Sequence, residues 1–297
     1  MITQKFLPFS YIFDKVKVPF FIVLTGAVAF ETLPLILGYR LPEIPINIAT
    51  TLGIAISILL SFKIGQSYDR WWEARKIWGA IVNDSRSLVL QLQLYLEAEN
   101  PVIRQMAYRQ IAWCYALTRS LREQEPMVDL DGLLPADELD GLRRHKNVPL
   151  GILGLQTASA KQLSGSELLD NFSRLQIDET LVRLTASMGK CERIKNTVFP
   201  TNYRKGLHLA IYLFSIFLIL SVPLQLSIVL EIVIVVVLSM IFFYLEKAAY
   251  LLQDPFENLP TDTAMTAISR TIDINLRQLL GETELPPKVQ PEDFYLM

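Results

Sequence analysis

Residues that carry covalent or metal chemistry are few in this 297-residue sequence. His145 and His208 are its only histidines, and Cys114 and Cys191 are its only cysteines. The motifs of zinc proteases, serine hydrolases, paired-cysteine metal sites and phosphate-binding loops do not occur in it. With two cysteines, neither a disulfide framework nor a zinc site is expected, so we interpret both as buried free thiols. The sequence therefore predicts no catalytic residues, no metal site and no cofactor.

One predicted helix instead carries two stripes of side chains whose spacing suits helix packing and the lining of a passage for small solutes. Residues 48–80 contain no helix breaker, so we expect one continuous helix there. Small residues recur on it at intervals of four: Ala49, Gly53, Ser57, Ser61 and Gly65. Residues at this spacing share one helix face, where another backbone can approach closely. We interpret this small-residue stripe as a helix-packing surface.

A second stripe of larger apolar residues, Ile54, Ile58 and Phe62, runs beside the first, also at intervals of four. If the small-residue stripe packs on a neighbouring subunit, the apolar stripe faces a central axis. Copies arranged in a ring would then line a hydrophobic constriction, which controls flow by wetting and dewetting. By periodicity alone, simple contact with lipid is the more common arrangement for such a stripe.

The same helix continues as SYDRWWEARKIWG, where Trp71 and Trp72 stand among charged residues. Tryptophan is enriched where a helix leaves the hydrocarbon core, because its ring is apolar with one polar edge. We expect Trp71 and Trp72 to anchor the helix at the membrane interface or to pack on soluble helices. Glu73 and Lys76 have the three-residue spacing of a helical ion pair.

Four apolar segments are long enough to cross a membrane, which takes about 20 helical residues. They are 16–39, 44–62, 206–224 and 226–245. They pair as two hairpins with short connections, and basic residues gather at the opposite ends of the segments. Since basic segments tend to remain in the cytoplasm, we expect both termini and the middle region there, in a cell (inner) membrane.

The segment between the hairpins has a different character. Apolar residues recur at helical spacing in it, for example Leu168, Phe172, Leu175, Leu181 and Leu184. The sequence thus predicts an all-α membrane protein with four parts: a transmembrane hairpin (1–62), a cytoplasmic helical region (63–205), a second hairpin (206–247), and a cytoplasmic C-terminal helix with an extended tail (248–297). Its 28 basic and 30 acidic residues give no support for nucleic-acid binding.

The longest motifs of the sequence resemble those of the bestrophin family, in its prokaryotic branch. They are SYDRWWEARKIWGAIVNDSRSL, CERI at Cys191, FPTNY before the third apolar segment and DPFENLP after the fourth. The resemblance covers nearly the whole chain, and motifs of this length are specific. It implies a ring-shaped homopentamer with four transmembrane helices per subunit and a large cytoplasmic helical bundle.

The resemblance also assigns residues. Counting back from the RWW signature places a pore neck on the apolar stripe already found by spacing. Counting back from Cys191 places a second, cytoplasmic constriction near Phe172, and a shift of one helical turn moves it to Leu168 or Leu175. Animal members carry an acidic run after DPF that forms part of a calcium clasp. Here Glu257 and Asp262 fall short of the six to eight oxygens that calcium takes, so we expect no calcium gating.

The expected function is passive transport of monovalent ions through the apolar neck, with chloride or another anion favoured by the weight of the family. A monovalent cation (sodium) channel of the same architecture is one alternative. A non-conducting membrane scaffold is another, whereas an alternating-access carrier is disfavoured because no inverted pair of broken spans occurs. The expected partners are further copies of the chain, the lipid bilayer and the permeating ions, but no nucleic acid.

Overall fold

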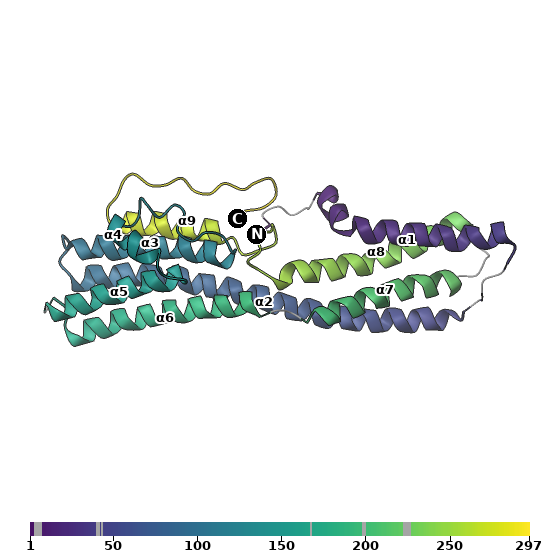
Figure 1. Ribbon diagram of the computed structural model, residues 1–297, viewed down its shortest axis with the longest axis horizontal. Helices are drawn as coiled ribbons and strands as arrows, with labels where there is room; N and C mark the ends of the chain where they lie inside the picture. The colour runs from purple at the N-terminus through teal and green to yellow at the C-terminus, as the bar shows by residue number, and fades with distance from the viewer. Residues whose placement is uncertain (3–7, 40–41, 43, 167, 198–199, 222–226) are drawn as a thin grey trace. The chain divides into compact units, whose positions relative to one another are not determined.

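The computed structural model describes residues 1–2, 8–39, 42, 44–166, 168–197, 200–221 and 227–297. Within these ranges the chain forms nine α-helices (Figure 1). Extended chain pairs there only in isolated bridges, between Ile2 and Tyr295 and between Glu292 and Tyr295. The predicted all-helical fold is confirmed.

The chain divides into two compact units, each built from distant parts of the sequence. The membrane unit holds residues 4–70 and 198–253, and the bundle unit holds residues 1–3, 71–197 and 254–297. Helix α2 (Ile46–Tyr95) contributes to both units and has no break between Arg70 and Trp71. The predicted continuous helix is therefore confirmed, and it extends past its expected end at Ala80.

Four long apolar helices form the membrane unit: α1 (Phe9–Leu37), the first half of α2, α7 (Thr201–Ser221) and α8 (Ile228–Gln253). Each of them is long and apolar enough to cross a membrane. Helix α8 packs on both α1 and α7. Over the described residues the four predicted spans are helical apart from a few residues at their ends, and residues 222–224 and 226 of these spans lie outside the described residues. The protein is a multi-pass membrane protein.

A buried apolar cluster joins the four helices of the membrane unit. It includes Val23 and Ala27 of α1, Ile56 and Leu60 of α2, Ile211 and Phe214 of α7, and Val235 and Phe243 of α8. Their outward faces still carry many exposed isoleucines, leucines, valines and phenylalanines. Such outward faces suit a lipid environment, because lipid tails are as apolar as these side chains.

The bundle unit joins the second half of α2 with α3 (Pro101–Leu121), α4 (Ala136–Leu142), α5 (Val148–Gly165), α6 (Asn171–Asn196) and α9 (Met265–Leu279). Capping residues mark where α3, α5 and α6 begin, and α3 is an example. The Asn100 side chain accepts a hydrogen bond from the Val102 amide at 3.0 Å, and Pro101 takes the first helical position. Helix α3 packs on α5, α6 and α9.

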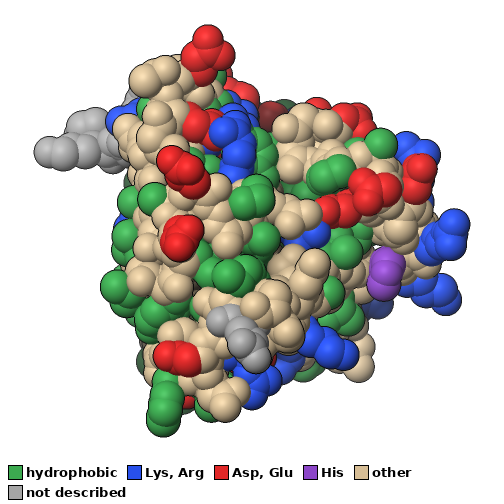
Figure 2. Space-filling model, turned by 90° about the vertical axis from the view of Figure 1, so that its left-hand side faces the viewer, with side chains coloured by type: hydrophobic (Ala, Val, Ile, Leu, Met, Phe, Trp, Pro, Cys, Tyr) green, Lys and Arg blue, Asp and Glu red, His purple; other side chains and the backbone are tan. Residues whose placement is uncertain are grey.

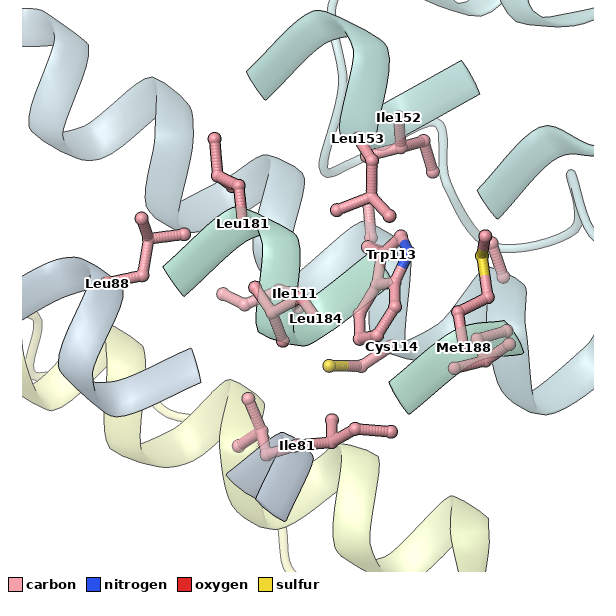
Figure 3. Packing of buried hydrophobic residues seen from close by; sticks show 14 of the residues in the cluster. Ile81, Leu88, Ile111, Trp113, Cys114, Ile152, Leu153, Leu181, Leu184 and Met188 are labelled. Atoms are coloured by element: carbon pink, nitrogen blue, oxygen red, sulfur yellow. The ribbon is translucent and has the colours of Figure 1, made fainter. Parts of the chain in front are cut away.

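Trp113 of α3 lies within the core of the bundle unit, where it is fully buried (Figure 3). The side chains drawn with it are buried as well, among them Cys114, Ile152, Leu153, Leu184 and Met188. They come from α3, α5 and α6, so one side chain joins three helices. Burial of this apolar surface is the main source of the stability of the unit.

The C-terminal tail follows α9 as extended chain, as predicted. Two contacts hold it along that helix. The Ala267 amide donates to the Met297 carbonyl at 2.8 Å, and Arg270 Nη1 donates to the Pro287 carbonyl at 3.1 Å. The tail is therefore part of the folded bundle unit.

Both cysteines are buried free thiols, as predicted, and burial raises the pKa of Cys114 and of Cys191 to about 12. Because the thiolate is the reactive form, we expect neither to react with a maleimide near neutral pH while the protein is folded. Both should react after denaturation. Mass spectrometry of the labelled protein counts the adducts, and an adduct on the folded protein would contradict the burial.

Candidate permeation site

The first half of α2 has two faces with opposite surroundings. Ile56 and Leu60 are 0% and 2% exposed and belong to the core of the membrane unit. The apolar stripe on the other face is open, at 57% exposure for Ile54, 52% for Ile58 and 67% for Phe62. With 3.6 residues per turn, side chains two positions apart lie on opposite sides of a helix. The stripe thus points away from its own chain, toward lipid or toward other copies.

Gly53 gives part of the small-residue stripe a partner within the chain. A Cβ atom at this position would lie 3.1 Å from Cε2 of Phe214 in α7, closer than nine in ten real Cβ contacts. Ala49, one turn earlier, is buried too. Three members of the stripe remain exposed: Ser57, Ser61 and Gly65. The part of the small-residue stripe that is open to another subunit is therefore shorter than the full stripe of five residues.

Trp71 and Trp72 lie in different surroundings, although their rings stack at a centroid distance of 6.2 Å. Trp71 is half-buried, and its indole Nε1 donates to the Thr261 carbonyl at 2.9 Å. It thereby ties α2 to the segment that follows DPFENLP. Trp72 is exposed, and its anchoring role stays a prediction. The predicted ion pair between Glu73 and Lys76 is confirmed, at 2.6 Å.

Phe172 is the second residue of α6 and is 83% exposed. Asp170 caps this helix, because its carboxylate accepts the Ser173 amide at 2.6 Å, and that hydrogen bond lowers the pKa of Asp170. The helix therefore starts at a defined residue just before Phe172. The neighbouring Leu168 and Leu175 are exposed too, whereas Leu181 and Leu184 are buried in the bundle. The candidate second constriction is thus an exposed apolar turn.

The two carboxylates after DPF have separate partners. Glu257 accepts from Lys195 Nζ at 2.6 Å, and Asp262 Oδ2 accepts from the Leu259 amide at 3.0 Å. Asp262 is buried, and burial raises its pKa to about 6. Among the described residues, no group of three or more histidine, cysteine, aspartate or glutamate side chains lies close enough to hold a metal ion.

Acidic and basic side chains are interspersed on the face of the protein shown in Figure 2. Apolar patches separate them. A cluster of charges of one sign raises the local concentration of ions of the opposite charge, and no single-sign cluster covers the face shown.

Sequence reasoning missed a buried charged cluster in the membrane unit. Lys63 of α2 and Glu246 of α8 have side chains that are 0% and 2% exposed, and Lys63 Nζ lies 3.4 Å from Glu246 Oε1. The two residues are 183 positions apart in the sequence. Each directly follows an apolar run, and this shared position is the local signal in the sequence that places the two side chains at the same level.

Comparison with known proteins places these features in a family context. The sequence profile described as "Bacterial/Fungal Bestrophin protein" matches residues 8–278. The voltage-dependent anion channel-forming protein YneE of Escherichia coli is 30% identical over 259 residues, which cover 87% of this chain and 84% of that protein. The voltage-dependent anion channel-forming protein RSc3414 of Ralstonia nicotianae is 30% identical over 260 residues, with 85% and 84% covered.

Solved structures show the same likeness in three dimensions. A bacterial bestrophin homologue from Klebsiella pneumoniae superposes with a TM-score of 0.82 at 28% sequence identity. The match covers 92% of this chain and 100% of that chain. The arrangement of the helices is thus shared over nearly the full length of both proteins.

Proposed function

The chain belongs to the bacterial and fungal bestrophin family, and from that premise we propose that it forms an anion channel with a neck lined by Ile54, Ile58 and Phe62. The observation that carries the proposal is the exposure of this apolar stripe on a helix whose opposite face is buried in its own chain. The two relatives described as anion channel-forming proteins support anions as the permeating species.

A pore of this kind needs several copies of the chain. The stripe of one subunit forms one wall, so copies must surround a common axis before a path is enclosed. The exposed small residues Ser57, Ser61 and Gly65 lie beside the stripe and allow a neighbouring helix to approach closely. We propose five copies, a homopentamer, as the family resemblance implies.

The neck has no charged side chain among its three residues. An ion that enters it loses part of its hydration shell without gaining a counter-charge. Large, weakly hydrated anions lose less hydration free energy than small ones when they shed water. We therefore expect thiocyanate to permeate more readily than chloride.

Phe172 extends the proposal to a second constriction at the cytoplasmic mouth. Its exposed ring at the start of α6 is a large apolar group left uncovered in the single chain. Leu168, which precedes α6, and Leu175, one turn further along α6, are the alternative lining residues. In the assembled channel these side chains would narrow the cytoplasmic end of the path.

The distribution of basic residues supports an orientation in the cell (inner) membrane. Lys63, Arg204 and Lys247 lie next to the apolar segments, on the side away from the short connections within the two hairpins. Basic segments tend to remain in the cytoplasm. Both termini and the bundle unit would then be cytoplasmic.

A single electrical measurement tests the sign of the permeating ion. Purified protein is placed in a planar bilayer under a tenfold KCl gradient. The current through it is expected to reverse near the chloride equilibrium potential, about 59 mV from zero. Chloride is then replaced by thiocyanate on one side of the bilayer. The resulting shift of the reversal potential should have the sign expected when thiocyanate is more permeant than chloride.

The other outcomes are equally clear. Reversal near the potassium equilibrium potential would identify a cation channel of the same architecture. Protein that is inserted and oligomeric but passes no current would identify a non-conducting scaffold. Either result would overturn the proposed anion channel.

A further inference from the structure

Three basic side chains surround one buried carboxylate in the membrane unit. Glu246 belongs to α8, Lys63 to α2, and Arg204 and His208 to α7. Arg204 Nε lies 3.2 Å from Glu246 Oε1, and His208 Nε2 lies 2.8 Å from Glu246 Oε2. Together with Lys63 Nζ at 3.4 Å from Oε1, these contacts join three of the four membrane helices.

Lys63 and Glu246 differ from the other two members in their burial. Their side chains are essentially inaccessible, whereas those of Arg204 and His208 are about a third exposed, at 34% and 35%. A buried charge is tolerated only when it is paired, because it has lost its hydration. Glu246 therefore compensates the buried charge of Lys63, and Arg204 and His208 contact the same carboxylate from partly exposed positions.

Lys63 directly follows Phe62, the most exposed member of the apolar stripe. Successive residues of an α-helix are rotated by about 100°. When the Lys63 ammonium is held inside the chain by Glu246, Phe62 is held on the open side of α2. A rotation of α2 that moved Phe62 away from the open side would withdraw Lys63 from its carboxylate.

We propose that Lys63 and Glu246 are positioning residues that set the rotation of α2 and thereby the direction of the neck side chains. This inference rests on the proposed function, because it takes the apolar stripe as the neck. The pair lies outside the permeation path and acts on it through the helix. It adds a specific interaction where apolar packing alone would leave the rotation less defined, since apolar contacts are not directional.

Replacing Glu246 by glutamine tests the proposal with little change in shape. Lys63 then loses its ion pair with Glu246, which weakens the restraint on the rotation of α2. We expect the thiocyanate-to-chloride permeability ratio of the reconstituted channel to change by about threefold or more. The double variant with Lys63→Met and Glu246→Gln also removes the buried charge of Lys63 and should recover part of the wild-type ratio.

A thiol reporter measures the rotation itself. Both native cysteines are buried, so a cysteine introduced by Phe62→Cys is the accessible thiol. In otherwise wild-type channels a water-soluble thiosulfonate should modify this cysteine from the pore and reduce the current. With Glu246→Gln also present, the rate of modification is expected to fall by about threefold or more.

Asp273→Asn is the matched control, because it makes the same chemical change in the bundle unit. Asp273 is a buried carboxylate paired with Arg277 at 2.6 Å. The permeability ratio and the reporter rate should stay at their wild-type values in this variant. A change as large as that of Glu246→Gln would show that loss of any buried ion pair disturbs the neck, and would overturn a specific role for Glu246.

Assembled Glu246→Gln channels with a wild-type permeability ratio and reporter rate would also overturn the inference. If this variant does not assemble, Glu246→Asp takes its place. It keeps the charge and shortens the side chain, so a smaller shift in the same direction is expected, and no shift would contradict the positioning role. Wild-type protein without anion current would instead overturn the proposed function itself.

Discussion

Replacing Ile58 by alanine is expected to raise anion flux through the reconstituted protein by about tenfold, equivalent to lowering the barrier by about 1.4 kcal/mol. Ile58 is the central member of the apolar stripe and is 52% exposed in the single chain. In a ring, every subunit loses three carbon atoms at the narrowest level of the path. The wider, less apolar neck holds water more readily, which removes part of the dewetting barrier.

The change is measured as chloride flux from liposomes that contain equal amounts of assembled protein. The variant with Ile54→Ala, Ile58→Ala and Phe62→Ala should give a larger increase than Ile58→Ala alone. Leu59→Ala is the matched control, because Leu59 follows Ile58 on the same helix and is exposed but lies outside the stripe. Its flux should equal that of the wild type.

Unchanged flux in the triple variant would show that the stripe does not line the permeation path. An increase in the Leu59→Ala variant equal to that of Ile58→Ala would show a general loosening of the membrane unit. Phe172→Ala distinguishes the two constrictions. If it raises flux while Ile58→Ala does not, the narrowest level lies at the start of α6.

Replacing Glu138 by alanine is expected to destabilise the bundle unit by about 3–5 kcal/mol, because it leaves the buried Arg109 guanidinium without its charge partner. The pair is bidentate: Arg109 Nε donates to Glu138 Oε2 at 2.9 Å, and Nη2 donates to Oε1 at 2.6 Å. Arg109 Nη1 also donates to Ser159 Oγ at 2.6 Å. One guanidinium thus joins α3, α4 and α5.

Thermal unfolding in detergent measures this loss. A decrease of 3–5 kcal/mol should lower the Tm by about 10 °C in a chain of this size. Asp140→Ala is the control on the same short helix, because its ion pair with Arg143 at 3.5 Å is largely exposed. Exposed pairs contribute little, so its Tm should not change measurably. Equal Tm values for both variants would show that the buried pair does not hold α4 in place.

Much of the fold follows from local sequence patterns. The apolar runs are long enough to predict four membrane helices, and each is a helix in the structure. The absence of breakers predicts that α2 is continuous, and the Asn100–Pro101 pair marks the start of α3. These features depend on residues close in sequence, where spacing and capping act directly.

The apolar stripe is also a local pattern, since side chains four residues apart share one face of any helix. Sequence alone left open whether Ile54, Ile58 and Phe62 face a central axis or lipid. The structure shows that the stripe lies on the exposed side of α2, because Ile56 and Leu60 take the inner positions. The place of the stripe in a pore stays a prediction that the flux variants test.

The sequence by itself determined the helices, their apolar faces and the family motifs. Only the tertiary structure decided which distant residues meet: Gly53 with Phe214, Trp71 with Thr261, Arg109 with Glu138, and Lys63 with Glu246. The reason is physical. Helix periodicity is a property of neighbouring residues, whereas the pairing of buried charges and the close approach of helices depend on how all the faces pack together.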